Sequence, residues 1–381
     1  MPASGTHING DQRVDAALLV SAGFVVSVLA LLVFLLCWVA PVHARVTGPC
    51  SNCHTMHYSQ NNSILSEWDE GGPHQALLRT DCGGCHTGTN EFGGKTPFVM
   101  SDAPEYGESG IEANATTLAG GSFYWVNQPA NKAVGGEATG HNVAGLTTAD
   151  SILHTPPGFD GGRAAADGSR PGGGTWPSGQ QVTCAGVYGC HGTHSEAAQT
   201  SAIHGAHHGD LGGARINPGN APAAGYRFLV GIEGYEDPNW EIRPTADAHN
   251  QYKGLNNPGG SNTSTISSLC ARCHGAYHSG TGNTGTSSPW LRHPTDYDMG
   301  NASSSEYRNY GGMGNSYNPA VPLASETVTS VKNKVTFSND TIVTCLSCHR
   351  AHGSKYYKAM RWNYAGSVNG GLCTECHSSK K

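Results

Sequence analysis

Charged side chains are scarce in this sequence. Asp, Glu, Lys and Arg together make up 13% of the 381 residues, where soluble proteins average about 25%. Neither sign dominates, because 22 basic residues stand against 28 acidic ones. This composition excludes coiled coils, charged disordered tails and proteins that bind nucleic acid through a basic surface.

Large side chains for an apolar core are also few. Aromatic residues account for only 8% of the chain, whereas glycine alone contributes 53 residues, roughly twice its usual share. Glycine and alanine bury little apolar area each, so they supply little of the free energy that stabilises a core. The chain holds 20 His and 13 Cys, which predicts that a metal cofactor replaces part of that core.

The N-terminal segment predicts export. Residues Ala16 to Ala40 contain no charge and are rich in Leu, Val and Phe, and Val42-His43-Ala44 offers small residues for signal-peptidase cleavage before Arg45. The run is longer than a typical signal core and long enough to span a bilayer. Residues 1–44 are therefore either a signal peptide or an uncleaved membrane anchor. Cys37 is interpreted as an apolar residue of the run.

The other twelve cysteines fall into six pairs, and a histidine follows the second cysteine of each pair. Five pairs have the spacing C-x-x-C-H, and their residues are Cys50, Cys53 and His54; Cys82, Cys85 and His86; Cys270, Cys273 and His274; Cys345, Cys348 and His349; Cys373, Cys376 and His377. Two thiols at this spacing form thioethers with the vinyl groups of one haem, and the next imidazole ligates the iron. Zinc knuckles and disulfides use similar cysteine spacings, but neither explains a histidine after every pair.

The sixth motif is stretched. Five residues, Ala-Gly-Val-Tyr-Gly, separate Cys184 from Cys190, which precedes His191. A loop in this spacer would still let both thiols reach one porphyrin edge, and Gly186 and Gly189 permit such a loop. A disulfide between Cys184 and Cys190 is the alternative. The sequence therefore predicts six haem c groups, or five if that disulfide forms.

Each iron needs a sixth ligand unless its site is catalytic. Twelve histidines remain as candidates: His57, His74, His141, His154, His194, His204, His207, His208, His249, His278, His293 and His352. His57, His194 and His352 each follow a motif histidine by three positions, and His278 follows one by four. A histidine so placed cannot reach the far face of its own haem, so we expect it to ligate a neighbouring haem. Methionine is a competing ligand at one or two haems at most, because the chain has six Met in all.

The spacing of the motifs predicts a loop-rich fold wrapped around a chain of haems. We expect short helices at the motifs, a few short strands and an N-terminal hydrophobic helix. The expected segments are a haem pair at 45–110, a Gly-rich stretch at 111–183, two central haems at 184–300, a β-hairpin at 301–344 and a second haem pair at 345–381. The hairpin is expected to turn around Ser338-Asn339-Asp340 and return along residues 341–343, and a short strand is expected at Ser122 to Val126.

The motif segments resemble multihaem c-type cytochromes of metal-reducing bacteria. The resemblance lies in the paired motifs at both ends, in Gly-Pro-Cys50-Ser-Asn-Cys53-His54-Thr-Met-His57, and in Cys345-Leu-Ser-Cys348-His349-Arg-Ala-His352 followed by Met360-Arg-Trp362. Some members of this family are secreted and polymerise into filaments. The resemblance implies bis-histidine haems in a continuous chain. The stretched third motif and the long export segment depart from the family pattern.

These observations predict a non-enzymatic electron carrier in the periplasm or outside the cell. Its expected partners are redox proteins, and further copies of itself if it forms a filament, but not nucleic acid. Two alternatives stay open: a membrane-anchored, quinol-linked cytochrome, because Cys50 lies ten residues past Ala40, and a multihaem reductase with one open haem. Nitrite-reducing relatives mark their catalytic haem with C-x-x-C-K, which does not occur in this sequence.

Overall fold

The computed structural model describes most of the chain after residue 48. The described residues are 1, 49–54, 59–60, 63–64, 78, 80–101, 104–105, 115–128, 136–207, 215–216, 226–278, 293–363 and 371–378. The chain divides into two units, Met1–His43 and Ala44–Lys381. The predicted N-terminal apolar helix lies outside the described residues. Within the described residues, no helix has the length and apolar character needed to cross a membrane.

Short helices form at the five regular motifs, as expected. Cys50–Asn52 (η1), Cys345–Ser347 (η11) and Gly371–Glu375 (η13) are 3-10 turns, whereas Cys82–His86 (α2) and Ile266–His274 (α4) are α-helical. The residue before each α-helix caps it: the Gly84 amide donates to Asp81 Oδ1 over 2.9 Å, and the Ser268 amide donates to Thr265 Oγ1 over 3.2 Å. A capped turn is therefore sufficient to present two cysteines and a histidine.

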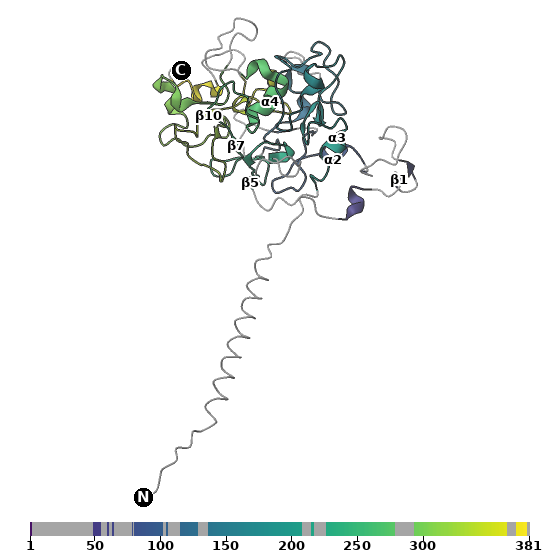
Figure 1. Ribbon diagram of the computed structural model, residues 1–381, viewed down its shortest axis with the longest axis horizontal. Coiled ribbons are helices and arrows are strands. Elements are labelled where there is room, and N and C mark those ends of the chain that lie inside the picture. Colours follow the sequence, from purple (N-terminus) through teal and green to yellow (C-terminus); the bar gives the residue numbers. More distant parts are fainter. Residues whose placement is uncertain are drawn as a thin grey trace. The chain divides into compact units, whose positions relative to one another are not determined.

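The stretched motif folds differently. Thr183–Ala185 (β3) and Gly189–His191 (β4) pair in parallel as a separate two-stranded sheet, with Thr183 opposite Gly189 and Ala185 opposite His191. Among the described residues the third α-helix is Gln199–Ala202 (α3), labelled next to α2 in the view of Figure 1. A small hairpin joins Ser59–Gln60 (β1) to Ser63–Ile64 (β2).

The largest sheet is built from very short strands that are far apart in sequence. Its order is β5-β6-β7-β9-β10-β8, and only β7 and β9 are parallel. The strands are Arg215–Ile216 (β5), Gly234–Tyr235 (β6), Gln251–Lys253 (β7), Tyr297–Asp298 (β8), Ala324–Ser325 (β9) and Ile342–Val343 (β10). The sheet thus joins strands from two of the segments predicted from sequence, 184–300 and 301–344.

Isolated 3-10 turns connect these elements. They are Phe123–Trp125 (η2), Gly136–Thr139 (η4), Pro171–Gly174 (η5), Tyr226–Phe228 (η7), Gly275–Tyr277 (η8), Met299–Asn301 (η9), Ser305–Asn309 (η10) and Tyr357–Ala359 (η12). Most other described residues form turns and loops, so the loop-rich architecture expected from the glycine content is confirmed.

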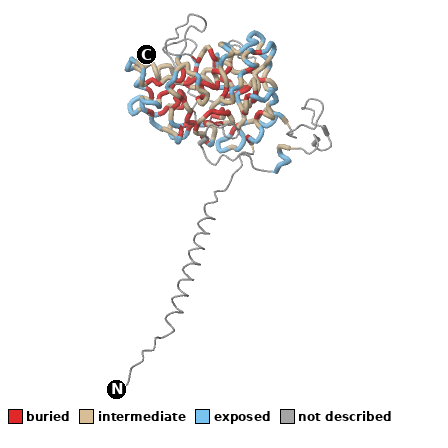
Figure 2. The backbone as a smooth tube through the Cα atoms, viewed as in Figure 1, coloured by how far each residue is buried: buried red, intermediate tan, exposed pale blue. Residues whose placement is uncertain are grey.

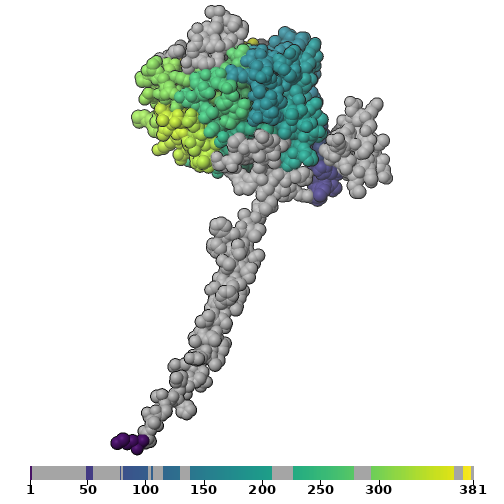
Figure 3. Space-filling model, viewed as in Figure 1, coloured from purple at the N-terminus to yellow at the C-terminus, as the bar shows by residue number. Residues whose placement is uncertain are grey.

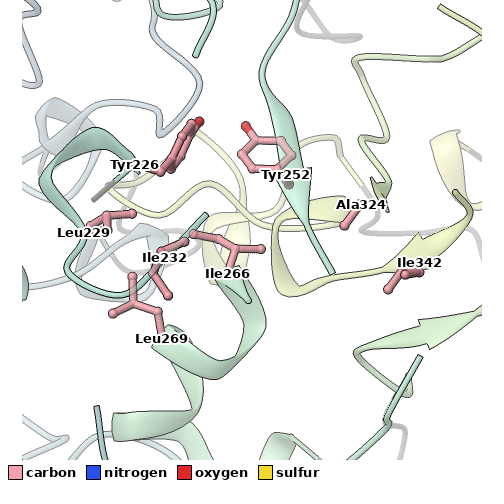
Figure 4. Packing of buried hydrophobic residues seen from close by; sticks show 8 residues of the cluster. All are labelled: Tyr226, Leu229, Ile232, Tyr252, Ile266, Leu269, Ala324 and Ile342. Carbon is pink, nitrogen blue, oxygen red and sulfur yellow. The ribbon is translucent and has the colours of Figure 1, made fainter. Parts of the chain in front are cut away.

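Two apolar clusters provide the core between the strands and motif helices. In the first, side chains of the 226–232 turn pack against α4 and β7, as Figure 4 shows for Leu229, Ile266 and Tyr252. The second gathers around Tyr310, Leu323 and Trp362, with Cys348 and Cys376 packed against it. Figure 2 shows these buried residues running through the interior of the described body. The core therefore reaches directly to the cysteines of the motifs.

One local prediction is wrong and another holds only in part. Residues 122–126 are not a strand, because the Tyr124 amide donates to Ser122 Oγ over 3.3 Å and a 3-10 turn, η2, follows. Within 301–344, β9 and β10 do pair antiparallel, with Ile342 opposite Ala324, but residues 326–341 between them contain no strand that turns tightly at 338–340.

Side chains rather than a strand ladder hold the turn at 338–340. The Asp340 carboxylate accepts hydrogen bonds from Lys332 Nζ, from Ser325 Oγ over 2.7 Å and from Thr336 Oγ1 over 2.6 Å. Val335 is buried in the second cluster instead of alternating along a strand. The segment between β9 and β10 is therefore held by side-chain hydrogen bonds and burial rather than by strand pairing.

Candidate haem-binding site

All six motifs open onto one cavity. It has a volume of about 2810 Å³, whereas pockets for single small ligands span about 300–1,000 Å³. Segments from both halves of the chain surround it, and Figure 3 shows their colours grading across one face from teal to green and yellow. Its lining includes all twelve cysteines of the motifs and the motif histidines His54, His86, His191, His274, His349 and His377.

No disulfide joins the cysteines of the described residues, and this includes Cys184 and Cys190. These two thiols lie on adjacent strands of the β3–β4 pair, midway between the two paired positions. Neighbouring strands are separated by about 4.8 Å. The spacer therefore returns the chain beside itself and brings two thiols six positions apart onto one short edge.

Four motif histidines share one ring orientation. Nδ1 lies within hydrogen-bond distance of a backbone carbonyl, at 2.7 Å from Pro97 O for His86, 2.9 Å from Arg227 O for His191, 2.7 Å from Pro157 O for His274 and 2.8 Å from Lys358 O for His349. A histidine that donates through Nδ1 presents Nε2 with its lone pair free for a metal. Backbone segments outside each motif thus orient its imidazole.

Four motif histidines face a second imidazole. The ring centres are separated by 6.2 Å for His86 and His207, 6.5 Å for His191 and His352, 5.9 Å for His274 and His141, and 6.0 Å for His377 and His293. Imidazole nitrogen binds a first-row metal at about 2 Å. Two rings on opposite faces of one iron therefore have centres about 6 Å apart, which is the spacing seen at all four pairs.

The histidines that face the motif histidines also have surroundings like those of metal ligands. His141 Nδ1 lies 2.6 Å from Ala351 O, like the motif histidines. Burial lowers the pKa of His141, His191 and His349, that of His274 to about 4 and that of His352 to about 3. Iron binds neutral imidazole, so these environments favour the form that a ligand requires.

Three other candidates use their ring nitrogens within the protein. His194 is fully buried with Nε2 3.2 Å from Cys190 O. His249 stacks on Tyr317 and contacts backbone carbonyls with both nitrogens, at 2.8 and 3.3 Å. The Nε2 atom of His278 lies 3.2 Å from the buried carboxylate of Asp296.

The remaining candidates are less well placed. His154 and His204 are exposed residues of the cavity lining. His57, His74 and His208 lie outside the described residues. Within the described part of the chain, no second imidazole packs against His349.

Contacts between cysteines place the motifs in a row. Cys184 donates a hydrogen bond to Cys82, which lowers the pKa of Cys82 and raises that of Cys184, and Cys270 and Cys345 form the same kind of pair. Burial and then the nearby Cys190 thiol raise the pKa of Cys273 to about 12, and burial and then Cys348 do the same for Cys376. The second to sixth motifs are therefore neighbours in the order of the sequence.

The pairing of histidines is the part of the site that sequence reasoning could not provide. His141, His207 and His293 carry no local signature that separates them from His249 or His204. What distinguishes them is that each lies beside an imidazole from a distant part of the chain, and this depends on tertiary structure alone.

Comparison with known proteins agrees with this site. Residues 339–381 match the family described as the doubled CXXCH motif. The C-type cytochrome OmcS of Geobacter sulfurreducens is 25% identical in a comparison that spans 378 residues. The match covers 85% of this chain and 80% of that protein. The chain is thus similar to a c-type cytochrome, and its C-terminal residues to proteins with doubled haem motifs, as the sequence indicated.

Two solved structures are also similar to the chain. The "Outer Membrane Cytochrome S Filament from Geobacter Sulfurreducens" has a TM-score of 0.41 at 20% identity, covering 85% of both chains. The "Cryo-EM of the OmcS nanowires from Geobacter sulfurreducens" has a TM-score of 0.39 at 19% identity, covering 88% of this chain and 99% of that one. Scores at this level do not establish a common fold.

Proposed function

We propose that the protein is an exported hexahaem c-type cytochrome that passes electrons along a row of bis-histidine haems. The observation that carries this proposal is the spacing of about 6 Å in four separate imidazole pairs, each containing one motif histidine. Haem supplies the reversible one-electron chemistry of iron. The protein supplies covalent attachment, axial ligands and a buried environment.

We assign the residues of the site as follows. Each motif binds one haem through its two cysteines and ligates the iron with its histidine. The second ligands are His207 for the site of His86, His352 for His191, His141 for His274 and His293 for His377. Those for the sites of His54 and His349 come from His57, His74, His154, His204 and His208. His194 and His249 contact backbone carbonyls instead, and His278 contacts the Asp296 carboxylate.

The order of the sites makes the row continuous from the second motif to the sixth. Cys82 contacts Cys184 and Cys270 contacts Cys345, while Cys190 and Cys348 are close enough to raise the pKa of Cys273 and Cys376. Cofactors attached at such neighbouring thiols lie almost in contact. Electrons entering at one terminal pair of motifs can therefore reach the other pair in short steps.

Export and assembly extend the proposal. The apolar run of residues 16–40 directs the chain out of the cytoplasm as a signal or as an anchor, and the similarity to OmcS supports an extracellular site of action. Because structures of that relative carry filament and nanowire in their titles, self-association is the assembly to test. Electron microscopy of purified protein shows filaments if it is correct and single particles if it is not.

A reductase is the second candidate function. The absence of a second imidazole beside His349 within the described residues is the observation that favours it. An open iron at that site would bind cyanide or nitrite and change its optical spectrum. We expect no such change, because one of the five histidines left for the sites of His54 and His349 completes this one.

The haem count is the first test. Intact-mass measurement of the secreted protein should give the processed chain plus six haem masses, because the two strands of the third motif place Cys184 and Cys190 side by side. An increment of five haems with two hydrogens missing would show that these cysteines form a disulfide. The third haem would then be absent, and His191 would have no iron to bind.

Electron equilibration is the second test. When a fast donor reduces part of the protein, the haem spectra should relax together in a single phase, because the second to sixth motifs are neighbours and all six motifs line one cavity. Stopped-flow absorption spectroscopy records this relaxation. A haem that stays oxidised while the others exchange electrons would contradict a continuous row.

A further inference from the structure

The spacer of the stretched motif forms an unusually short backbone loop between the two parallel strands β3 and β4. Parallel strands usually need a connection of a dozen or more residues, yet only Gly186–Tyr188 connect β3 to β4. Gly186 has a φ of 89°, and a Cβ on Gly189 would lie 2.5 Å from the Ala185 nitrogen. Hydrogen bonds from Gly189 N to Gly186 O and from Cys184 N to Gln199 Oε1 hold part of this loop, whereas the carbonyls of Val187 and Gly189 accept hydrogen bonds from the next haem motif.

One side chain from the next haem motif supplies those contacts. Arg272, the residue before Cys273, donates hydrogen bonds from its two terminal nitrogens to Gly189 O over 2.9 Å and to Val187 O over 3.1 Å. Both acceptors belong to the stretched spacer. The guanidinium therefore bridges the spacer of the third motif and the helix of the fourth.

The buried position of the Arg272 guanidinium is energetically unfavourable for its charge. Arg272 is 2% exposed, and no carboxylate of the described residues lies within 4 Å of it. Its Nε–H is buried without a hydrogen-bond partner there. Burying a charge that only carbonyl groups solvate is strongly unfavourable, so a neutral donor would be less costly if hydrogen bonding were its only role.

We propose that Arg272 is a positioning residue for two haems: it holds the stretched spacer in the form that accepts haem, and its buried charge raises the reduction potential of the haems bound by the third and fourth motifs. The proposal rests on the proposed attachment of haem at Cys184 and Cys190. Attachment adds each S–H across a vinyl group, so it needs both thiols at one porphyrin edge and no oxidant. A buried cation beside the cysteines of both motifs would favour the reduced form of the haems that they would hold.

The substitution Arg272→Gln tests both roles. Gln removes the charge and keeps at most one hydrogen bond to the spacer. Intact mass and peptide mapping should show loss of haem from Cys184 and Cys190 in most molecules. In molecules with six haems, the equilibrium constant for reduction of the affected haems should fall about tenfold. This corresponds to a reduction potential lower by about 59 mV for one electron.

Arg361→Gln is the matched control. Arg361 is also 2% exposed, and it also donates to backbone carbonyls, those of Ala320 and Pro319, at 3.0 Å each. This variant should keep haem at the third motif. Loss of that haem from both variants would show a general loss of stability and overturn the specific role of Arg272.

A variant with a shortened spacer separates the effect of the Arg272 hydrogen bonds from the effect of its charge. Deleting residues 187–189 converts the third motif to Cys184-Ala185-Gly186-Cys190-His191, which has the regular spacing. Arg272→Gln should then leave six haems but still lower the two potentials. If Arg272→Gln does not accumulate as a folded protein, Arg272→Lys replaces it. Lys keeps the charge, so wild-type reduction potentials together with a lower haem occupancy at Cys184 and Cys190 support the proposal.

The outcomes also separate this proposal from the proposed function. A wild-type protein with five haems and a Cys184–Cys190 disulfide refutes the haem assignment at this motif. A wild type with six haems, together with an Arg272→Gln variant that has six haems and unchanged potentials, refutes only the role of Arg272.

Discussion

Replacing His352 by alanine should convert one of the six haems to the high-spin state while leaving all six attached. His352 faces His191 with ring centres 6.5 Å apart, and burial lowers its pKa to about 3, which keeps the imidazole neutral. Alanine provides no ligand, so the iron bound by His191 loses its sixth bond. Electron paramagnetic resonance and the visible spectrum report the spin state, and added imidazole should restore the low-spin signal.

His249→Gln is the control for this prediction. His249 is a buried histidine whose ring nitrogens both contact backbone carbonyls, so its replacement should leave every haem low-spin. Low-spin spectra in the His352→Ala variant without added ligand would contradict the pairing of His352 with His191. A high-spin signal in the His249 variant would contradict the criterion by which we separate ligands from structural histidines.

Acid should destabilise the protein through His194. Burial, and then the positive charge of Arg272, lower the pKa of His194 to about 4, although Asp167 opposes the shift. In the unfolded chain the pKa is near 6.5, so the unfolded state binds the proton first as the pH falls. His194 therefore does not lower the free energy of unfolding above about pH 6.5. Between about pH 6.5 and pH 4 it lowers the free energy of unfolding by about 3 kcal/mol in total.

The substitution His194→Gln isolates this contribution. Gln does not titrate and keeps a donor for Cys190 O, which His194 Nε2 contacts at 3.2 Å. The free energy of unfolding should therefore fall less steeply with acid in the variant, by about 2 kcal/mol between pH 7 and pH 4.5. Denaturant titrations at the two pH values measure it, and parallel acid dependence in both proteins would show that His194 does not titrate in this range.

The sequence by itself determined the cofactor chemistry. Attachment of haem needs two thiols and an imidazole within one turn of backbone, so the whole requirement lies within five consecutive residues such as Cys82–His86. For the same reason it predicted short helices at the regular motifs. The glycine content, with few large apolar residues, predicted a loop-rich fold because neither helices nor long strands could bury enough surface.

The tertiary structure decided everything that depends on residues far apart in the chain. A second ligand needs only an imidazole at the right point in space, so nothing near His141 or His207 in the sequence distinguishes it from His249. The tight hairpin expected around 338–340 is absent for a related reason: β10 pairs with β9 at Ala324, and Val335 between them is buried in the cluster of Tyr310 and Trp362. The stretched motif shows both levels at once: the sequence identifies its two cysteines and its histidine, whereas only the tertiary structure brings Arg272, from the next motif, onto its backbone.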